Sequence, residues 1–503
     1  MRNLMMISCV AMFCVTASAV SVPTVSNVRV SQNQDTRVVS IEYDLVKGVD
    51  SISEAIITVD LQTNAVANAV EGWVSIGGRH CRSLAGDVNR MLSDGTDRKA
   101  IWVPDFDLPG VSIDAGCFRA VVKAWPTNSP PDYWAIDLSG GKCHFYYPDA
   151  DCLPEGIDSD KWRMEQMLMR RIPARNVVWQ MGSPENELGR DTSTTYGANM
   201  EKQHKVKLTH DYYIGVFEVT QYQMEVARAG SPNASKFTNS LHWATRPAEY
   251  TNFADRYHEN TDPTSSDPSV RHSCLNWKVT GTMRNRTGLN YYLDLPTESQ
   301  WEFACRAGCT NALYDGNELS METGEDANLS KLARYKYTVE DVNADYSCST
   351  NSGTARVGTY APNDWGLYDM LGNVAEMCLD CYGSYTNFTD EISVDPLGPK
   401  FCGTVPHDTY PAMHRVIRGG SYQSTAAGCR TSSRAREQIW TSSSSTGARM
   451  CYTLVNDDIV IEGSLSESVP LATSLVSPAH APSTAEGSST LRCVPYGGRV
   501  TVR

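Results

Sequence analysis

Short runs of apolar and β-branched residues, separated by polar turns, dominate the first quarter of the chain. The runs lie at residues 28–30, 38–43, 55–59, 100–103 and 117–125. Strand-length runs with no helical period between most of them are typical of a β-sandwich. A polar stretch at 126–131 ends in two adjacent prolines and predicts a linker. We therefore expect an all-β sandwich over residues 20–126.

The pattern changes twice after the linker. Residues 127–174 hold an apolar patch at 133–134 and 145–147, and the segment 158–171 predicts a helix with Asp158 or Ser159 as its N-cap. From Val177 onward Gly, Trp, Tyr and Asn are frequent, helical periods are short and turn signals recur. This predicts a connecting region with one helix, followed by a large irregular α+β domain over residues 175–451.

The two ends of the chain differ from its middle. Arg2 precedes an apolar run at 4–15, and Ala17-Ser18-Ala19 then gives the small-x-small pattern of a signal-peptidase site. We expect a signal peptide at 1–19 and export to the periplasm, cell surface or extracellular space. Residues 452–503 are rich in Ser, Thr and Ala and contain scattered prolines, which predicts a loosely ordered tail.

Charge and hydropathy exclude several classes of protein. The formal net charge is −14, and the sequence pI of about 5.2 argues against a nucleic-acid binder, which normally has a basic face. No later apolar run reaches the roughly 20 residues of a membrane-spanning helix. Fourteen cysteines lie outside the predicted signal, and in an exported protein they favour disulfides. Cys378-x-x-Cys381 has the spacing of a redox pair or half a zinc site.

Five segments of the α+β region are unusually specific. In chain order they are 178–183 (VWQMGS) with 212–220 (YYIGVFEVT), 295–308 (LPTESQWEFACRAG), 363–376 (NDWGLYDMLGNVAE), 415–422 (RVIRGGSY) and 447–449 (GAR). Thr297 and Gln300 have the spacing of a capping box, so a helix begins at Glu298. Trp301, Ala304 and Cys305 then share one face, which we expect to be core.

Together these segments resemble the formylglycine-generating enzyme (sulfatase-modifying factor) family over about residues 175–451. The resemblance implies an irregular fold related to C-type lectins, often holding structural calcium. Enzymes of the family use copper on two cysteines, together with dioxygen, to oxidise a substrate cysteine to formylglycine.

Calcium is the cofactor that the resemblance makes most plausible here. It implies a side-chain oxygen from Asp369 and carbonyl oxygens from Met370, Gly372 and Val374, and calcium prefers oxygen ligands of these kinds. Asn328 and Leu329 stand where the second calcium loop of the family begins, although the rest of that loop is altered. An ordinary hydrogen-bonded turn is the alternative at both places.

The copper site does not match the family. Its two cysteines stand two and seven residues after the aromatic of Gly-Gly-Ser-aromatic, which here are Ser424 and Cys429, counted from Tyr422. A serine hydroxyl is a poor ligand for the soft Cu(I) ion. Counted back from the GAR segment, Cys429 also lies off the second ligand position. Both tryptophans of the family's Gly-Asn-x-Trp-Glu-Trp are replaced, so we do not expect copper.

Three hypotheses follow. The first is an exported scaffold that has lost the copper pair and binds a peptide, a glycan or a protein partner through the former active-site groove. The second is an oxidoreductase in which a distant thiol, Cys378 or Cys381, joins Cys429. The third is a structural component of an envelope or matrix. The candidate catalytic residues are Cys429, Ser421 and Arg434, and the candidate pocket residues are Tyr422, Ser424 and Arg436.

Overall fold

The computed structural model describes residues 24–46, 54–114, 116–192, 200–228, 234–238, 242–249, 280–290, 292–338, 353–385, 391–398, 414–438 and 441–455. The predicted signal peptide and almost all of the predicted tail lie outside these residues. Within them, every helix is too short or too polar to cross a membrane.

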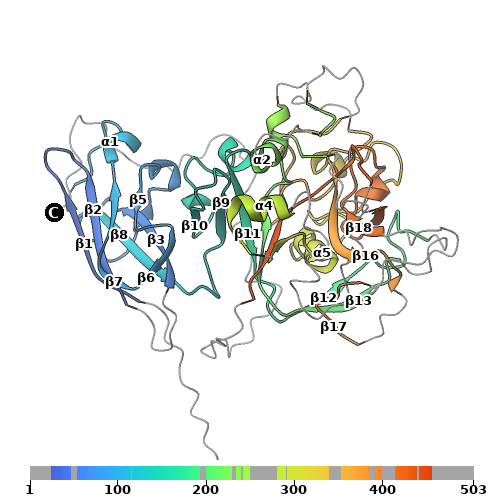
Figure 1. The fold of residues 1–503 in the computed structure, drawn as a ribbon, viewed down its shortest axis with the longest axis horizontal. Coiled ribbons are helices and arrows are strands. Elements are labelled where there is room, and N and C mark those ends of the chain that lie inside the picture. The colour runs from blue at the N-terminus through green and yellow to red at the C-terminus, as the bar shows by residue number, and fades with distance from the viewer. Residues whose placement is uncertain are drawn as a thin grey trace, which may run out of the picture.

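The predicted sandwich is present, and all of its predicted strands form. One sheet has the order β1 (Thr24–Gln32), β2 (Val39–Val46), β7 (Gly95–Trp102), β5 (Ala85–Gly86). The other has the order β4 (Val74–Ser75), β3 (Glu54–Thr63), β6 (Arg90–Ser93), with β8 (Phe118–Trp125) also paired to β3. Alternate residues of β2 point inward, as the period of a strand requires. The short helices α1 (Pro104–Asp107) and η1 (Gly78–His80) complete the sandwich, which lies on the left in Figure 1, beside the rest of the described chain.

The remaining chain is an α+β domain built on three sheets. The largest has the order β10 (His144–Tyr147), β9 (Tyr133–Asp137), β11 (Gln166–Ile172), β14 (Tyr212–Gly215), β21 (Cys451–Thr453), β15 (Leu293–Asp294). The second has the order β12 (Val177–Met181), β13 (His204–Leu208), β17 (Ser393–Val394), and the third β19 (Arg434–Gln438), β18 (His414–Arg418), β16 (Ala375–Cys381), β20 (Thr446–Gly447).

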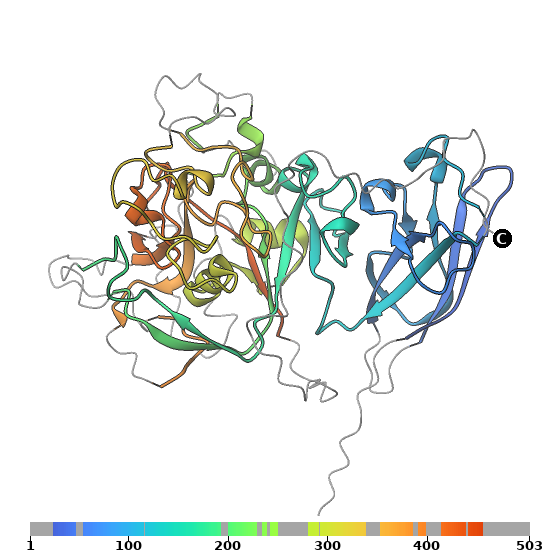
Figure 2. The same ribbon diagram turned by 180° about the vertical axis from the view of Figure 1, so that it is seen from behind.

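Helices are short in this domain, as the sequence predicts. In the residues that the structure describes, its α-helices are α2 (Gln221–Ala227), α4 (Thr280–Thr287) and α5 (Glu298–Arg306). The 3-10 turns are η2 (Ala150–Cys152), η3 (Asp160–Arg163), η4 (Trp243–Thr245), η5 (Leu329–Lys331) and η7 (Ala426–Cys429). Figure 2 shows the coils and loops crowded around β16 and β18 on the side away from the sandwich.

The predicted helix at 158–171 is wrong. Ser159 does cap a helical turn, but η3 ends at Arg163 and β11 begins at Gln166. β11 lies between β9 and β14, so backbone pairing on both edges outweighs the helical propensity of its Met, Leu, Gln and Arg residues. Residues 133–172, which we expected to connect two domains, therefore supply three strands of the largest sheet.

Helix α5 is the predicted core helix. The Thr297 side chain accepts from the Gln300 backbone N–H and the Gln300 side chain accepts from the Thr297 N–H, which completes the capping box. Every residue of the helix is buried, including Glu298 and Glu302. Buried carboxylates are stable only when they are paired.

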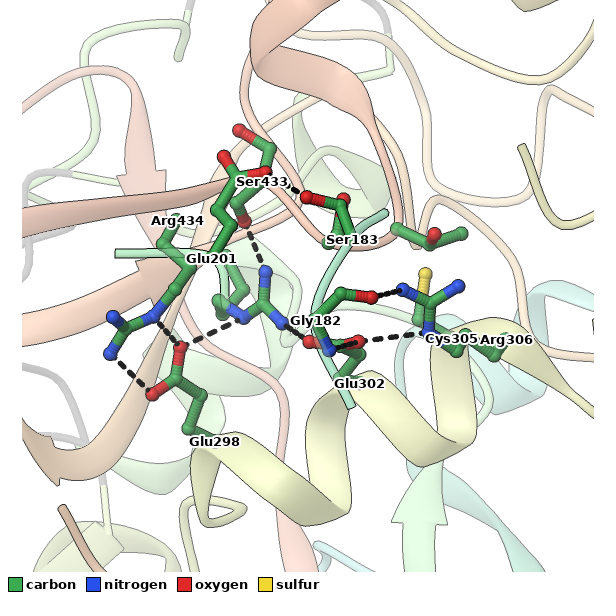
Figure 3. Close-up of polar contacts among 12 residues, drawn as sticks. Gly182, Ser183, Glu201, Glu298, Glu302, Cys305, Arg306, Ser433 and Arg434 are labelled. Atoms are coloured by element: carbon green, nitrogen blue, oxygen red, sulfur yellow. Dashed lines mark hydrogen bonds and ion pairs between the residues drawn. The ribbon is translucent and has the colours of Figure 1, made fainter. Parts of the chain in front are cut away.

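Arginines from the third sheet and from α5 itself provide that pairing. Arg434 binds Glu298 through two hydrogen bonds of 2.5 and 2.7 Å, and Arg306 binds Glu302 at 2.8 Å (Figure 3). Arg418 contacts both carboxylates. Burial alone would raise the pKa of Glu302, but the guanidinium groups of Arg306 and Arg418 outweigh it and hold the pKa below its usual range.

Candidate functional site

The predicted active-site residues begin at a tight turn after β18. Gly419 and Gly420 have φ angles of 86° and 71°, a conformation that other residues rarely adopt. A side chain on Gly420 would meet the Gly428 carbonyl oxygen at 2.5 Å and the Cys429 sulfur at 2.7 Å. The turn, residues 419–424, is therefore pressed directly against η7.

Cys429, the last residue of η7, lies directly beneath Gly420 of this turn. It is fully buried in the largest hydrophobic cluster of the domain. Burial raises the pKa of its thiol to about 12, although the backbone N–H groups of Ser421 and Gly372 act in the opposite direction. The structure thus brings together Cys429, Ser421 and the first predicted calcium loop. A neutral, buried thiol is a poor metal ligand and a poor nucleophile.

The two serines of the turn bond mainly to the turn itself. The Ser424 hydroxyl accepts from the Ser421 backbone N–H at 3.0 Å, and the Ser421 hydroxyl accepts from the Gln423 N–H at 3.2 Å. Ser421 is buried and Ser424 is half-buried, whereas Gln423 between them is exposed. Both predicted residues therefore have a satisfied structural role.

Tyr422 is more enclosed than a pocket wall would be. Only 2% of it is exposed, its ring meets Phe237 edge-on at 5.6 Å, and its hydroxyl lies 3.1 Å from that of Ser444. Gln423 donates to the same hydroxyl at 3.0 Å. Phe237 is a member of this site that the sequence did not reveal, because its segment carries none of the recognised motifs.

The two candidate arginines belong to a different place. Arg434 and Arg436 lie on β19, and Arg434 donates to Glu298 and to the carbonyls of Met200 and Gly383. Its guanidinium also lies over the Tyr385 ring at 3.9 Å. Arg434 and Glu298 therefore form a buried ion pair with a structural role. Arg436 is half-buried two residues further along the strand.

The first predicted calcium loop contains an unsatisfied oxygen. Asp369 is 1% exposed; its Oδ2 accepts from the Gly358 N–H at 2.6 Å, but its buried Oδ1 has no hydrogen-bond partner. Burial raises the pKa of Asp369 to about 6, although the Gly358 N–H and the Arg449 and Arg163 guanidiniums lower it; the Glu376 carboxylate adds to the rise. An orphaned acceptor in a buried acidic setting is what a bound cation would satisfy. The residues of this loop therefore fit calcium.

Glu218 is the unexpected neighbour of this loop. Its carboxylate accepts from the Asn373 side chain at 2.6 Å and from the Val374 N–H at 3.1 Å, and it is 1% exposed. It thus fixes the backbone that carries the predicted carbonyl ligands. Among the described residues, however, no three His, Cys, Asp or Glu side chains converge as a metal cage, so calcium here would depend on carbonyls.

The second predicted calcium loop is organised differently. The Asp326 carboxylate accepts from the N–H groups of Asn328 and Leu329, at 3.0 and 2.9 Å, and also from Ser320 and Met321. Leu329 is buried and starts η5. The turn is complete without an ion, and no observation favours calcium there.

Most of the described cysteines are free thiols, whereas we predicted disulfides. Nine are free, namely Cys81, Cys117, Cys143, Cys152, Cys305, Cys309, Cys378, Cys429 and Cys451. Cys381 is disulfide-bonded. Because Cys378 is a free, buried thiol, the two cysteines of the CxxC are not bonded to each other. The predicted redox pair is therefore absent from this structure.

Comparisons with known proteins relate the α+β domain to one family. The family described as "Sulfatase-modifying factor enzyme 1-like domain" matches residues 169–454. The formylglycine-generating enzyme of Thermomonospora curvata is 36% identical over 131 residues, covering 25% of this chain and 38% of that enzyme. The Streptomyces coelicolor enzyme is 34% identical over 176 residues, covering 34% of this chain and 49% of that enzyme.

The chain thus spans less than half the length of these relatives. Among solved structures, Treponema denticola variable protein 1 aligns with a TM-score of 0.40 and 20% identity, over 57% of this chain and 95% of that one. The family match covers more than half of the 503 residues and includes all five segments that carry the resemblance. The chain therefore belongs to the family of sulfatase-modifying factor enzyme 1-like domains.

Proposed function

We propose that this protein is an exported binding protein that keeps the scaffold of its family without the copper chemistry. One observation carries the proposal: Cys429 is buried beneath Gly420, and Ser424 stands where the first thiolate of the family would be. The copper site of the family consists of two cysteine thiolates, which are the soft ligands that Cu(I) prefers. The Ser424 hydroxyl instead bonds to the Ser421 backbone.

A binding role suits the surface above the turn. Exposed Gln423 presents its amide group next to the hydroxyl of Tyr422, whose buried ring packs edge-on against that of Phe237. Polar groups on a rigid aromatic base are typical of sites that recognise peptides or glycans. The net charge of −14 makes a neutral or basic ligand more favourable than an acidic one.

The test of the copper part uses the mature protein loaded with Cu(I) and mixed in air with a Cys-x-Pro-x-Arg peptide. Mass spectrometry should find no conversion to formylglycine, and the protein should retain no stoichiometric copper after desalting. The S. coelicolor relative serves as the positive control. Conversion by this protein would overturn the proposal in favour of an oxidoreductase with a remote second thiolate.

The test of the binding part screens the wild-type protein on peptide and glycan arrays. Gln423→Arg should abolish any binding found, because it places a long cation at the centre of the proposed face. Ala435→Arg, at an exposed position on β19, is the matched control and should bind normally. Equal binding by both variants would place the ligand elsewhere, and no binder on either array would favour a structural role.

We also propose that calcium binds at Asp369. One millimolar calcium should raise the midpoint of thermal unfolding relative to EDTA, because a ligand at 100 times its Kd stabilises by about 2.7 kcal/mol. Asp369→Ala should remove this difference, whereas Asp364→Ala, exposed in the same loop, should keep it. Unfolding curves of the wild-type protein that coincide in calcium and EDTA would refute the proposal.

A further inference from the structure

A cavity of about 380 Å³ lies between the sandwich and the α+β domain. The sandwich contributes residues of β3 and the segment 75–90, and the other wall comes from β10 and the segment 148–155. The two walls touch directly, because β10 contacts β3 and β6, and the Tyr146 N–H donates to the Asn89 carbonyl at 2.7 Å. In both ribbon views this is where the sandwich meets its neighbour (Figures 1 and 2).

Each wall of the cavity carries one cysteine. Cys81 directly follows η1 in the sandwich, and Cys152 is the last residue of η2 in the α+β domain. Both line the cavity, both are half-buried, and both are free. They are 71 positions apart in the sequence, with the predicted linker between them.

The backbones around these two cysteines are in close contact. No side chain could be placed on Gly78 in η1, because the Cys152 carbonyl already occupies that position. Burial raises the pKa of both thiols, with smaller contributions from Asp107 at Cys81, from Asp149 at Cys152, and from Asp60, which lines the same cavity, at both. The segments η1 and η2, which adjoin Cys81 and contain Cys152, are therefore in direct backbone contact.

We propose that Cys81 and Cys152 form a disulfide that ties the sandwich to the α+β domain. One thiolate attacks a disulfide oxidant, such as oxidised glutathione or a protein disulfide, and releases one thiol of that oxidant. The second cysteine then displaces the other half. The two protein thiols lose two electrons and two protons, and the oxidant becomes two thiols.

This bond would fix the two domains relative to each other. The loop of chain that it closes contains the linker at 126–131, so the sandwich could no longer change its orientation about that linker. It would also hold the width of the cavity constant. A cross-link that closes a long loop chiefly restricts the unfolded chain, and this effect should raise the midpoint of thermal unfolding by about 5 °C.

The experiment uses the full mature chain, reduced, desalted and incubated with oxidised glutathione. Non-reducing peptide mapping should find one peptide pair joining Cys81 to Cys152, and the midpoint of unfolding should rise and return to its starting value with dithiothreitol. Exposed Cys143 is the internal control and should not join to either cysteine. Cys81→Ser and Cys152→Ser should each lose the linked pair and the shift, whereas Cys143→Ser should keep both.

The mapping of the wild-type protein decides the proposal even if a variant fails to fold. The proposal is overturned if Cys81 and Cys152 are both fully alkylated after oxidation, or if each is found joined only to glutathione.

Discussion

Arg449→Met should lower the free energy of unfolding by about 4 kcal/mol, because it leaves a buried carboxylate without its counter-ion. Arg449 is fully buried and donates to Glu376 at 2.5, 2.9 and 3.0 Å, and also to the carbonyls of Gly215 and Tyr368 at 2.8 and 2.7 Å. These contacts join β14, β16 and the predicted calcium loop at one point. Urea unfolding at pH 7 measures the loss.

Arg356→Met is the matched control. Arg356 pairs with Asp160, whose side chain is 54% exposed, and such surface pairs contribute less than about 1 kcal/mol. The double variant Arg449→Met/Glu376→Met should recover only part of the stability, because Trp301 then loses the acceptor that it reaches at 2.7 Å. A loss below about 1 kcal/mol in Arg449→Met would show that this arginine is not central to the fold.

Gly420→Ala should destabilise the protein by more than about 3 kcal/mol. Two effects add: the positive φ of this residue strains an alanine, and the new methyl group would overlap the Gly428 carbonyl and the Cys429 sulfur. The carbonyl belongs to the backbone and cannot rotate away. Relief requires the 419–424 turn to separate from η7, which would also expose the Cys429 thiol.

Gly316→Ala separates the two effects. Gly316 has a φ of 86°, and nothing lies within 4 Å of the position where its side chain would be. It should therefore show the strain alone, about 1 kcal/mol. The free energy of unfolding and the rate of Cys429 alkylation are measured for both variants. Equal losses would mean that the close contact at Gly420 relaxes without difficulty.

Local signals were sufficient to predict much of the fold. Strand β2 of the sandwich alternates apolar and polar residues, β3 contains a short continuous apolar run, and the capping box of α5 depends on residues three positions apart, so none of these needs knowledge of distant contacts. The segment 158–171 was different. Its composition favours a helix, but β9 and β14, which lie far from it in the sequence, pair with both of its edges. Local composition carries no information about strand partners that are distant in the sequence.

The same distinction applies to the candidate site. Motif spacing named Cys429, Ser421 and the Asp369 loop as separate candidates, and the structure brings them together. It could not reveal that Arg434 pairs with Glu298 instead, since the two are 136 positions apart. Nor could it reveal Glu218 or Phe237 as members of the site. The 212–220 motif contains Glu218, but only the fold shows that its carboxylate accepts hydrogen bonds from Asn373 and Val374 of the predicted calcium loop.

The position of β21 in the largest sheet sets a condition on how the protein is made. This strand, the last in the described part of the chain, lies between β14 and β15, and it pairs with both. During translation β14 is synthesised long before β21, so one of its edges has no native partner until residues 451–453 leave the ribosome. The sheet can close only after this domain has been synthesised almost completely, and until then the nascent chain presents an open strand edge to chaperones and to other chains.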